Sequence, residues 1–321
     1  MEKFERKYAI ITGFMGTVRD RFIEYHPKRE MEQMVEMAAR VPKCTGLEVV
    51  YPQNFEDAGA LKILLDKYKL ETAAVNLNIK GDEIWRYGTF SCPDKYVRDA
   101  AIQKMKNAMD AAAELGCNMV QTALLNDGTD YPFELNYLDA YKYVADGIRE
   151  CAEYRPDVRI SLEYKLSEPR VRCLFNNAGK MAYLCELIGK DNVGVTLDTG
   201  HAFQSLEAPG ESAAFLGANK RLFYVHVNDN TRSWDWDLLP GVVNLWEFIE
   251  FFYYLKKVGY TGYFTADVFP NRNDPIKIFT KTFEWMDFML DICEKLDEAK
   301  VEQLQREKDN FGLLDYVRSL L

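Results

Sequence analysis

Four residues that could bind a metal ion end four short apolar segments in the second half of the chain. Glu163, Asp198, His226 and Asp267 close the segments ISLE, VTLD, YVH and TAD. Three carboxylates brought together would repel one another and raise one another's pKa values, a penalty that a bound cation removes. Carboxylates with one imidazole suit Mn²⁺, Mg²⁺ or Co²⁺, and Zn²⁺ less specifically. If the fold brings the four together, they predict a divalent-metal site.

A second group of residues could hold another ion beside the first. His201 follows Asp198 by three residues, and Asp235 and Asp237 lie in the segment WDWDL. We therefore expect one or two ions per chain, with Asp198 bridging in the second case. A solvated acidic loop is the alternative for Asp235 and Asp237.

Other residues near these segments could contact a substrate. Lys165 lies two residues after Glu163, and its ammonium group could polarise a substrate oxygen. A simple salt bridge to a nearby carboxylate is the alternative for Lys165. Trp85, Trp234 and Trp236 could form walls for the face of a sugar, with ordinary packing at the rim as the alternative. Asn76 is a further candidate for substrate binding.

Strands that run parallel would bring these segment ends to one rim. Eight short β-rich segments alternate with longer amphipathic ones, which predicts parallel strands with helical crossovers. The strands are predicted at Tyr8–Thr12, Gly46–Tyr51, Glu71–Val75, Met119–Ala123, Arg159–Glu163, Val193–Asp198, Phe223–Asn228 and Tyr263–Val268. The helices are predicted near 28–40, 57–69, 95–115, 135–152, 175–188, 210–218, 244–257 and 276–297.

Eight such units in 321 residues favour a closed barrel, with an open doubly wound sheet as the alternative. The sequence thus predicts a single (β/α)8 TIM barrel over residues 1–297 and a short C-terminal helical tail over 298–321. Gly116 is the expected C-cap of the third helix. Two arrangements of the tail stay open: it packs on a neighbouring subunit of a homo-oligomer, or it caps its own barrel. Active sites of such barrels lie at the C-terminal ends of the strands.

Composition argues against several classes of partner. Hydrophobic residues make up 48% and charged residues 28%, and the net charge is −10 with no long basic cluster. Nucleic acids and anionic membrane surfaces are therefore not expected partners. No run of about 18 apolar residues predicts a transmembrane helix, and the first residues lack the apolar core of a signal peptide. The seven scattered cysteines include no CxxC pair, which favours a cytoplasmic protein without a disulfide framework.

Several motifs resemble those of known sugar isomerases. The stretch EYKLSEPR at 163–170 resembles the Glu-x-Lys-x-x-Glu-Pro segment of xylose isomerases and the related bacterial L-rhamnose isomerases. The remaining matches are Asp198-x-x-His201 with their carboxylate-x-x-His pair, His226-Val227-Asn228-Asp229 with a His-x-Asn-Asp segment, and Asp235-x-Asp237-Leu238 with an Asp-x-Asp-Leu segment. Asp267 falls where these enzymes have their last carboxylate. The order and approximate spacing agree over residues 159–270.

The resemblance implies a role for each matched residue. Glu163, Asp198, His226 and Asp267 would bind a structural metal, and Asp198, His201, Asp235 and Asp237 a catalytic one. Lys165 would polarise the substrate. Two adjacent oxygens of a small carbohydrate would be held by the ions, and hydrogen would move between neighbouring carbons. An unphosphorylated sugar is preferred, because no phosphate-binding loop follows the last two strands.

One element of the resemblance is missing. Xylose and rhamnose isomerases supply a histidine from the N-terminal half that is thought to help open the sugar ring. This chain has only three histidines, and His26 lies in a loop before the first helix rather than at a strand end. The N-terminal strand ends offer other side chains instead: Glu48, Asn76, Trp85, Arg86 and Gln121.

Other activities therefore stay open beside isomerisation. Ketose 3-epimerases of the same superfamily use one metal and two acid/base glutamates, which would match Glu163 and the shorter Asp267, with Arg232 as a substrate arginine. Catalytic subunits of bacterial C-glycoside deglycosidases also resemble this superfamily; they cleave 3-oxo-glucosides by metal-assisted elimination and have a small partner subunit. Apurinic-site endonucleases are related barrels, but the acidic charge argues against DNA cleavage. A metal-binding, non-catalytic relative is the non-enzyme alternative.

Overall fold

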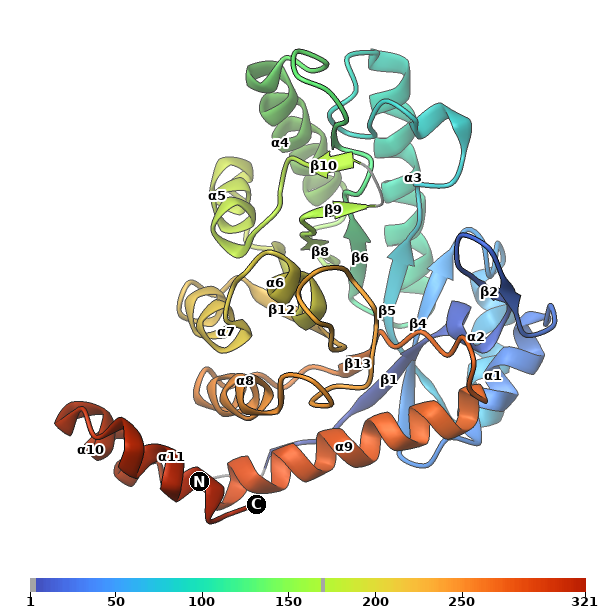
Figure 1. The fold of residues 1–321 in the computed structure, drawn as a ribbon. Helices are drawn as coiled ribbons and strands as arrows, with labels where there is room; N and C mark the ends of the chain where they lie inside the picture. The colour runs from blue at the N-terminus through green and yellow to red at the C-terminus, as the bar shows by residue number, and fades with distance from the viewer. Residues whose placement is uncertain (1–3, 169–170) are drawn as a thin grey trace.

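Eight parallel strands close into a barrel in the computed structural model, which describes residues 4–168 and 171–321 (Figure 1). The strands follow one another around the barrel in the order β1 (Tyr8–Ile11), β13 (Phe264–Ala266), β12 (Leu222–Val227), β11 (Val193–Asp198), β8 (Arg159–Glu163), β6 (Met119–Ala123), β5 (Glu71–Leu77) and β4 (Cys44–Tyr51). The predicted TIM barrel is confirmed, and the open sheet is excluded. All eight predicted strands overlap observed ones.

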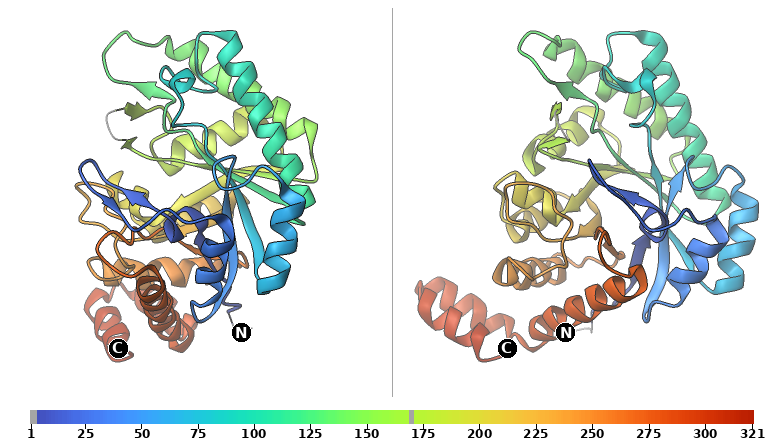
Figure 2. Two further views of the ribbon diagram at one scale, coloured as in Figure 1. Left: turned by 90° about the vertical axis from the view of Figure 1, so that its right-hand side faces the viewer. Right: turned by 45° about the vertical axis from the view of Figure 1, so that its right-hand side comes forward.

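Helices cross back between successive strands and surround the barrel (Figures 1 and 2). They are α1 (Met31–Ala39), α2 (Ala58–Tyr68), α3 (Lys95–Glu114), α4 (Tyr137–Tyr154), α5 (Ala178–Ile188), α7 (Pro209–Ala218), α8 (Leu245–Lys257) and α9 (Pro275–Lys295). Aspartates cap several of their first turns: Asp57 accepts a hydrogen bond from the Ala60 amide at 2.9 Å. At the end of α3, Gly116 has a φ of +75°, which suits glycine after a helix.

Several short elements in the loops after the strands were not predicted. The loop after β1 contains the 3₁₀ helix η1 (Thr12–Met15) and a hairpin of β2 (Val18–Arg19) and β3 (Glu24–Tyr25). The loops after β6 and β8 share a small antiparallel sheet of β7 (Gly128–Thr129), β10 (Val171–Cys173) and β9 (Ser167–Glu168). A 3₁₀ helix, η2 (Glu83–Trp85), follows β5, and a six-residue helix, α6 (Thr199–Gln204), follows β11. Each is too short to carry a periodic pattern.

The C-terminal tail forms two helices, α10 (Glu298–Glu307) and α11 (Asn310–Arg318), beside the end of α9 (Figure 1). Val301 is buried, and Leu313 and Val317 are partly buried against the core that includes α8. The tail therefore packs on its own barrel, although one large apolar side chain, Phe311, stays 82% exposed. Among the described residues, none of the helices is long and apolar enough to cross a membrane. The seven cysteines are free.

Aromatic side chains fill the space between the last strands and the outer helices. Phe264 is fully buried, and its ring lies 5.4 Å from that of Phe4, 5.6 Å from that of Phe252 and 5.9 Å from that of Tyr260. Because Phe264 lies three residues before Asp267, this packing fixes the strand that delivers one of the predicted metal ligands.

Phe264→Ala should destabilise the protein by ~3–5 kcal/mol, since it removes buried contacts and leaves a cavity. Chemical denaturation followed by circular dichroism would measure the loss. Phe22→Ala is the control, because Phe22 is 85% exposed and its removal should change stability by less than about 0.5 kcal/mol. Equal effects of the two substitutions would contradict this account of the core.

Candidate metal centre

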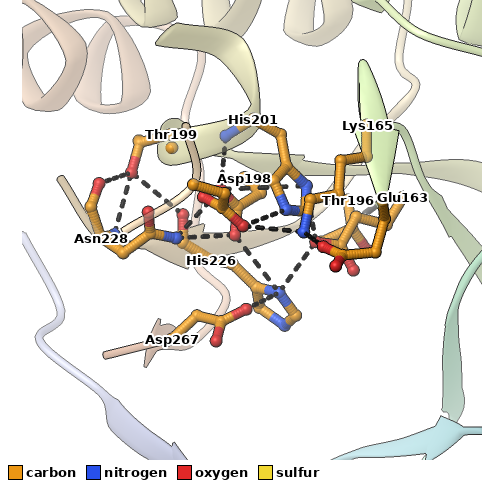
Figure 3. Close-up of polar contacts among 12 residues, drawn as sticks. Glu163, Lys165, Thr196, Asp198, Thr199, His201, His226, Asn228 and Asp267 are labelled. Carbon is orange, nitrogen blue, oxygen red and sulfur yellow. Dashed lines mark hydrogen bonds and ion pairs between the residues drawn. The ribbon is translucent and has the colours of Figure 1, made fainter. Parts of the chain in front are cut away.

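Glu163, Asp198, His226 and Asp267 converge at the C-terminal ends of their strands (Figure 3). Their potential ligand atoms all lie within 4.8 Å of one another, and we call these four residues the first cluster. The Nδ1 atom of His226 lies 3.4 Å from Glu163 Oε1, 3.8 Å from Asp198 Oδ2 and 3.4 Å from Asp267 Oδ2. The side chain of Asp267 is 18% exposed, and the other three are at most 5% exposed.

Strand register explains why these side chains meet. In the parallel pairing of β11 with β12, Asp198 is the partner of His226, and in that of β12 with β13, His226 is the partner of Thr265. Glu163 is the last residue of β8, the neighbour of β11 on the other side. Four consecutive barrel strands therefore place their polar ends at one rim, as the sequence predicts.

Polar residues outside the first cluster hold its members in place. Gln121, on β6, donates a hydrogen bond from Nε2 to Glu163 Oε2. Asn228, just after β12, donates from Nδ2 to Asp198 Oδ2 at 2.8 Å and lies 3.0 Å from Oδ1. Neutral amides satisfy part of each carboxylate without adding charge, so further oxygen lone pairs stay available to an ion.

A second cluster shares Asp198 with the first. Asp198, His201 and Asp235 bring potential ligand atoms within 4.8 Å of one another. His201 Nε2 lies 3.1 Å from Asp235 Oδ2, while its Nδ1 lies 3.0 Å from Glu163 Oε1. Helix α6 orients His201, because Asp198 caps it by accepting the His201 amide at 2.8 Å. Asp198 thus lies between the two clusters, as predicted for a bridging ligand.

A turn brings the loop after β12 back over the barrel. Asp229 and Leu238 form a two-way backbone bridge at 2.9 Å, and Asp237 adopts a left-handed φ of +48°. The Asp237 carbonyl also accepts the Phe269 amide at 3.0 Å, which ties this loop to the one after β13. The chain direction therefore reverses around Asp235 and Asp237.

The carboxylate of Asp229 closes this loop. It is fully buried and accepts hydrogen bonds from the amides of Asn230, Val243 and Asn244 at 2.8–3.0 Å, and from Asn244 Nδ2 at 2.6 Å.

Asp237 lies outside the set of three converging residues of the second cluster. Burial and the neighbouring carboxylates Asp235 and Asp267 raise the pKa of Asp237 well above its usual value. Asp237 is therefore a neighbour of the second cluster whose metal ligation stays a prediction.

Lys165 lies against the second cluster. Its Nζ atom is 2.8 Å from Asp235 Oδ2, and it also forms an ion pair with Glu168. The side chain is only 7% exposed. The predicted salt bridge therefore forms, whereas polarisation of a substrate oxygen by Lys165 stays a prediction. The last residues of the matched motif, Pro169 and Arg170, lie outside the described residues.

The convergence of charge shifts several pKa values. Burial raises the pKa of Asp198 to about 7, and Asp267 and Glu163 add to the rise. Burial would lower the pKa of His226, but Glu48 and Glu163 outweigh it and hold that pKa well above the usual value. For Glu163 the two histidines outweigh burial and hold its pKa well below the usual value. Bound protons thus compensate part of the negative charge of the first cluster, a role that a bound cation would take over.

Unpartnered buried atoms test whether an ion would fit. His226 Nδ1, His201 Nδ1 and Asp235 Oδ1 are buried and have no hydrogen-bond partner. Buried polar atoms are rarely left unsatisfied, so these three point to something bound between them. One imidazole with three carboxylates is a donor set for a divalent cation. The residues present therefore fit a divalent metal ion.

The residues predicted to contact a substrate have other surroundings in the structure. Asn76 donates to Glu48 Oε1 at 2.5 Å, and Trp85 is buried in the hydrophobic core. Trp234 lies in the loop before Asp235 and is partly buried. His26 lies away from the two clusters and contacts the Pro270 carbonyl at 2.6 Å through Nε2. The substrate-binding roles of Asn76, Trp85 and Trp234 stay predictions.

Arg232 points toward α8. Its Nη2 atom lies 2.7 Å from Glu247 Oε1, and its guanidinium stands 4.8 Å from the centre of the Phe203 ring. A substrate role for Arg232, which also stays a prediction, would require it to leave or share these contacts.

Sequence reasoning did not assign the residues that support the ligands. Glu48 lies 2.8 Å from His226 Nε2 through Oε2, although 178 residues separate the two in sequence. Glu48 and Gln121 were noted only as polar residues at N-terminal strand ends. A signal was present, because a polar side chain inside a barrel strand requires a buried partner. Which residue serves as that partner is determined by how the barrel closes.

Comparison with known proteins identifies the family. The sequence profile of the xylose isomerase-like TIM barrels matches residues 31–289, more than half of the chain. The chain belongs to this family. It is 29% identical to xylose isomerase from Thermus thermophilus over 208 residues, which cover 63% of this chain and 54% of that enzyme. The chain thus spans about half the length of this curated relative.

Solved structures with the same fold include sugar epimerases. An L-ribulose 3-epimerase superposes with a TM-score of 0.72 at 17% identity, covering 94% of this chain and 98% of its own. A D-allulose 3-epimerase from Methylomonas sp. superposes with a TM-score of 0.69 at 18% identity, covering 89% and 98%. At these identities the likeness shows the shared fold.

Binding of a divalent ion should release protons at neutral pH. The raised pKa values of Asp198 and His226 mean that both groups hold protons near pH 7, and an ion must displace them. Affinity for Mn²⁺ should therefore fall as pH falls, by about ten-fold per pH unit for each proton displaced. Calorimetry in buffers of different ionisation enthalpy would measure the release. An apparent enthalpy that does not depend on the buffer would contradict it.

Gly200→Ala should weaken the second cluster without unfolding the protein. A methyl group on Gly200 would collide with Asn228 Oδ1 and lie 2.8 Å from Asp235 Oδ1. Overpacking of this kind costs ~1–3 kcal/mol, which we expect as lost affinity for a second ion. Gly179→Ala is the matched control, because Gly179 is also the second residue of a helix and the added methyl group would lie at an ordinary contact distance of 3.5 Å from Asn177 Oδ1. Equal Mn²⁺ titrations of both variants would refute the proposed crowding.

Proposed function

We propose that the protein is a divalent-metal-dependent sugar isomerase, which moves hydrogen between adjacent carbons of a small, unphosphorylated carbohydrate. The observation that carries the proposal is the pair of clusters that share Asp198. Two neighbouring cation sites suit a substrate with two adjacent oxygens, and an aldose or ketose has this arrangement. Membership of the xylose isomerase-like family supports the same class of reaction.

The residues of the first cluster would hold one ion. Glu163, Asp198, His226 and Asp267 are the ligands, and Asp198, His201 and Asp235 could take a second ion, with Asp237 beside them. A bound Mn²⁺, Mg²⁺ or Co²⁺ would supply Lewis acidity that stabilises negative charge on the sugar oxygens. Near-complete burial of the ligands excludes water, which strengthens each of these electrostatic interactions.

Lys165 is suited to orient the sugar. An ammonium group has three N–H donors, and Asp235 and Glu168 account for two of them. The third can donate to a sugar oxygen beside the second cluster. Because both partners are carboxylates, burial does not neutralise the lysine: they hold its pKa well above the usual value against the effect of burial.

Epimerisation is the second candidate, and one observation favours it. Glu163 Oε1 and Asp267 Oδ2 lie at equal distances of 3.4 Å from His226 Nδ1. Two carboxylates placed around one centre could serve as base and acid, one removing a proton from a carbon and the other returning it. This reaction requires only the first cluster. A C-glycoside deglycosidase would require a partner subunit, which co-purification would reveal.

A metal analysis combined with a sugar panel tests the proposal. We expect about two Mn, Mg or Co ions per chain and aldose–ketose exchange on at least one sugar. Asp235→Asn and Lys165→Met should each lower kcat by about 10²–10³-fold, the usual effect of removing one group that stabilises developing charge. Elemental analysis and product chromatography are the measurements.

Lys106→Met is the matched control, since Lys106 is a partly buried lysine on α3 whose ion pair is with Glu150. It should leave kcat unchanged. One ion per chain with inversion at carbon 3 would replace the isomerase by the epimerase. Failure to retain any metal after purification in Mn²⁺ would reject the metal centre itself, and metal uptake without turnover would indicate a non-catalytic relative.

A further inference from the structure

We propose that Glu48 is a positioning residue, which fixes the tautomer and orientation of His226 so that Nδ1 faces the ion of the first cluster. The inference rests on the metal dependence proposed above, and it does not depend on which sugar is converted. Glu48 would touch neither ion nor substrate; it would act through the imidazole.

The contact crosses the interior of the barrel. Glu48 lies on β4 and His226 on β12, and two strands, β1 and β13, separate these in the barrel. Glu48 Oε2 is 2.8 Å from His226 Nε2, and the side chains are 0% and 1% exposed. A buried charge is retained only where it is paired, and the described structure gives Glu48 two partners, His226 and Asn76.

Chemistry of the partners sets the direction of the hydrogen bond. We take the Glu48 carboxylate as the acceptor of this contact, so that His226 donates from Nε2. In a neutral imidazole Nδ1 then carries the lone pair. This nitrogen faces three more acceptors, the carboxylates of Glu163, Asp198 and Asp267, and has no hydrogen-bond partner. A cation between Nδ1 and these oxygens would displace the proton on Nδ1 and receive its lone pair.

Glu48 is itself held away from the ion. Asn76, on the adjacent strand β5, donates to its other oxygen at 2.5 Å. The ring of Tyr224 packs edge-on against the imidazole, with centres 5.5 Å apart. Both sides of the Glu48–His226 pair are therefore fixed by neighbours that do not belong to either cluster. Such a carboxylate behind a metal-binding histidine raises the basicity of the ligand and holds its ring.

The geometry also assigns a task to the N-terminal half of the barrel. No histidine from that half reaches the centre among the described residues. Its contribution consists instead of Glu48 behind His226 and Gln121 behind Glu163, one supporting residue for each of two ligands.

The test compares Glu48→Leu and Glu48→Gln. Leucine removes the acceptor, and we expect Mn²⁺ affinity to fall by about 10–100-fold, the usual effect of losing such a partner. Glutamine keeps an oxygen that can accept from Nε2, so it should retain most of the affinity. Calorimetric Mn²⁺ titration of the full chain provides the dissociation constants. If Glu48→Leu does not fold, the same comparison is made with Asn76→Ala, which frees Glu48 Oε1, and a fall in affinity is again expected.

A spectroscopic readout separates positioning from mere stabilisation. The chain has three histidines, so ¹⁵N-histidine NMR of the Mg²⁺-loaded protein can resolve the tautomer of each ring. We expect His226 to be protonated at Nε2 in the wild type and in Glu48→Gln, and this preference to be lost in Glu48→Leu. A ring that keeps the same tautomer and a Mn²⁺ affinity equal to the wild type in Glu48→Leu would overturn the inference.

Asp127→Asn is the matched control. Asp127 is a carboxylate as fully buried as Glu48, but it accepts from the amides of Thr89 at 3.0 Å and Ser91 at 2.7 Å, away from both clusters. It should lower stability and leave Mn²⁺ affinity unchanged; an equal fall in both variants would overturn the positioning role. If the wild type binds no Mn²⁺ or Mg²⁺, the proposed function fails together with this inference, an outcome distinct from intact binding that Glu48 does not affect.

Discussion

Repulsion among buried carboxylates is the constraint on which the rest of this structure depends. Glu163, Asp198 and Asp267 approach one another at a rim where water is largely excluded, so their negative charges repel one another strongly. The barrel leaves them little freedom to separate, because parallel register fixes the strand ends that carry them. Positive charge must therefore come from elsewhere. Two histidines, one lysine and, as we propose, divalent cations supply it.

The two halves of the barrel contribute in different ways. The strands from β8 onward supply the candidate ligands, whereas β4, β5 and β6 supply residues that hold those ligands from behind. Neutral amides on Gln121 and Asn228 are well suited to this, since they orient a carboxylate without changing the charge of the centre. This division explains how an N-terminal half without a catalytic histidine can still be required for the centre.

Much of this could be predicted from the sequence, and the reason is periodicity. Apolar segments ending in polar residues predicted the eight strands, and barrel geometry predicted that Glu163, Asp198, His226 and Asp267 would meet. The pairing of Glu48 with His226 could not be predicted in this way, because only closure of the barrel brings together these two residues, which are 178 positions apart in the sequence. Helix α6 and the left-handed conformation of Asp237 were not predicted, because α6 is only six residues long and the other feature is a single residue. Arg232 shows a further difficulty, because a loop arginine can find a local partner such as Glu247 that spacing does not reveal.

The loop closed by Asp229 has a consequence for how ions would exchange. Its hydrogen bonds join the loop to itself and to the neighbouring loop, and none of them needs an ion. The conformational entropy of ordering Asp235 and Asp237 is therefore lost when the chain folds rather than when an ion binds. A centre preorganised in this way can lose an ion and regain it while the loop keeps its shape. Ion binding and loop closure are then independent events.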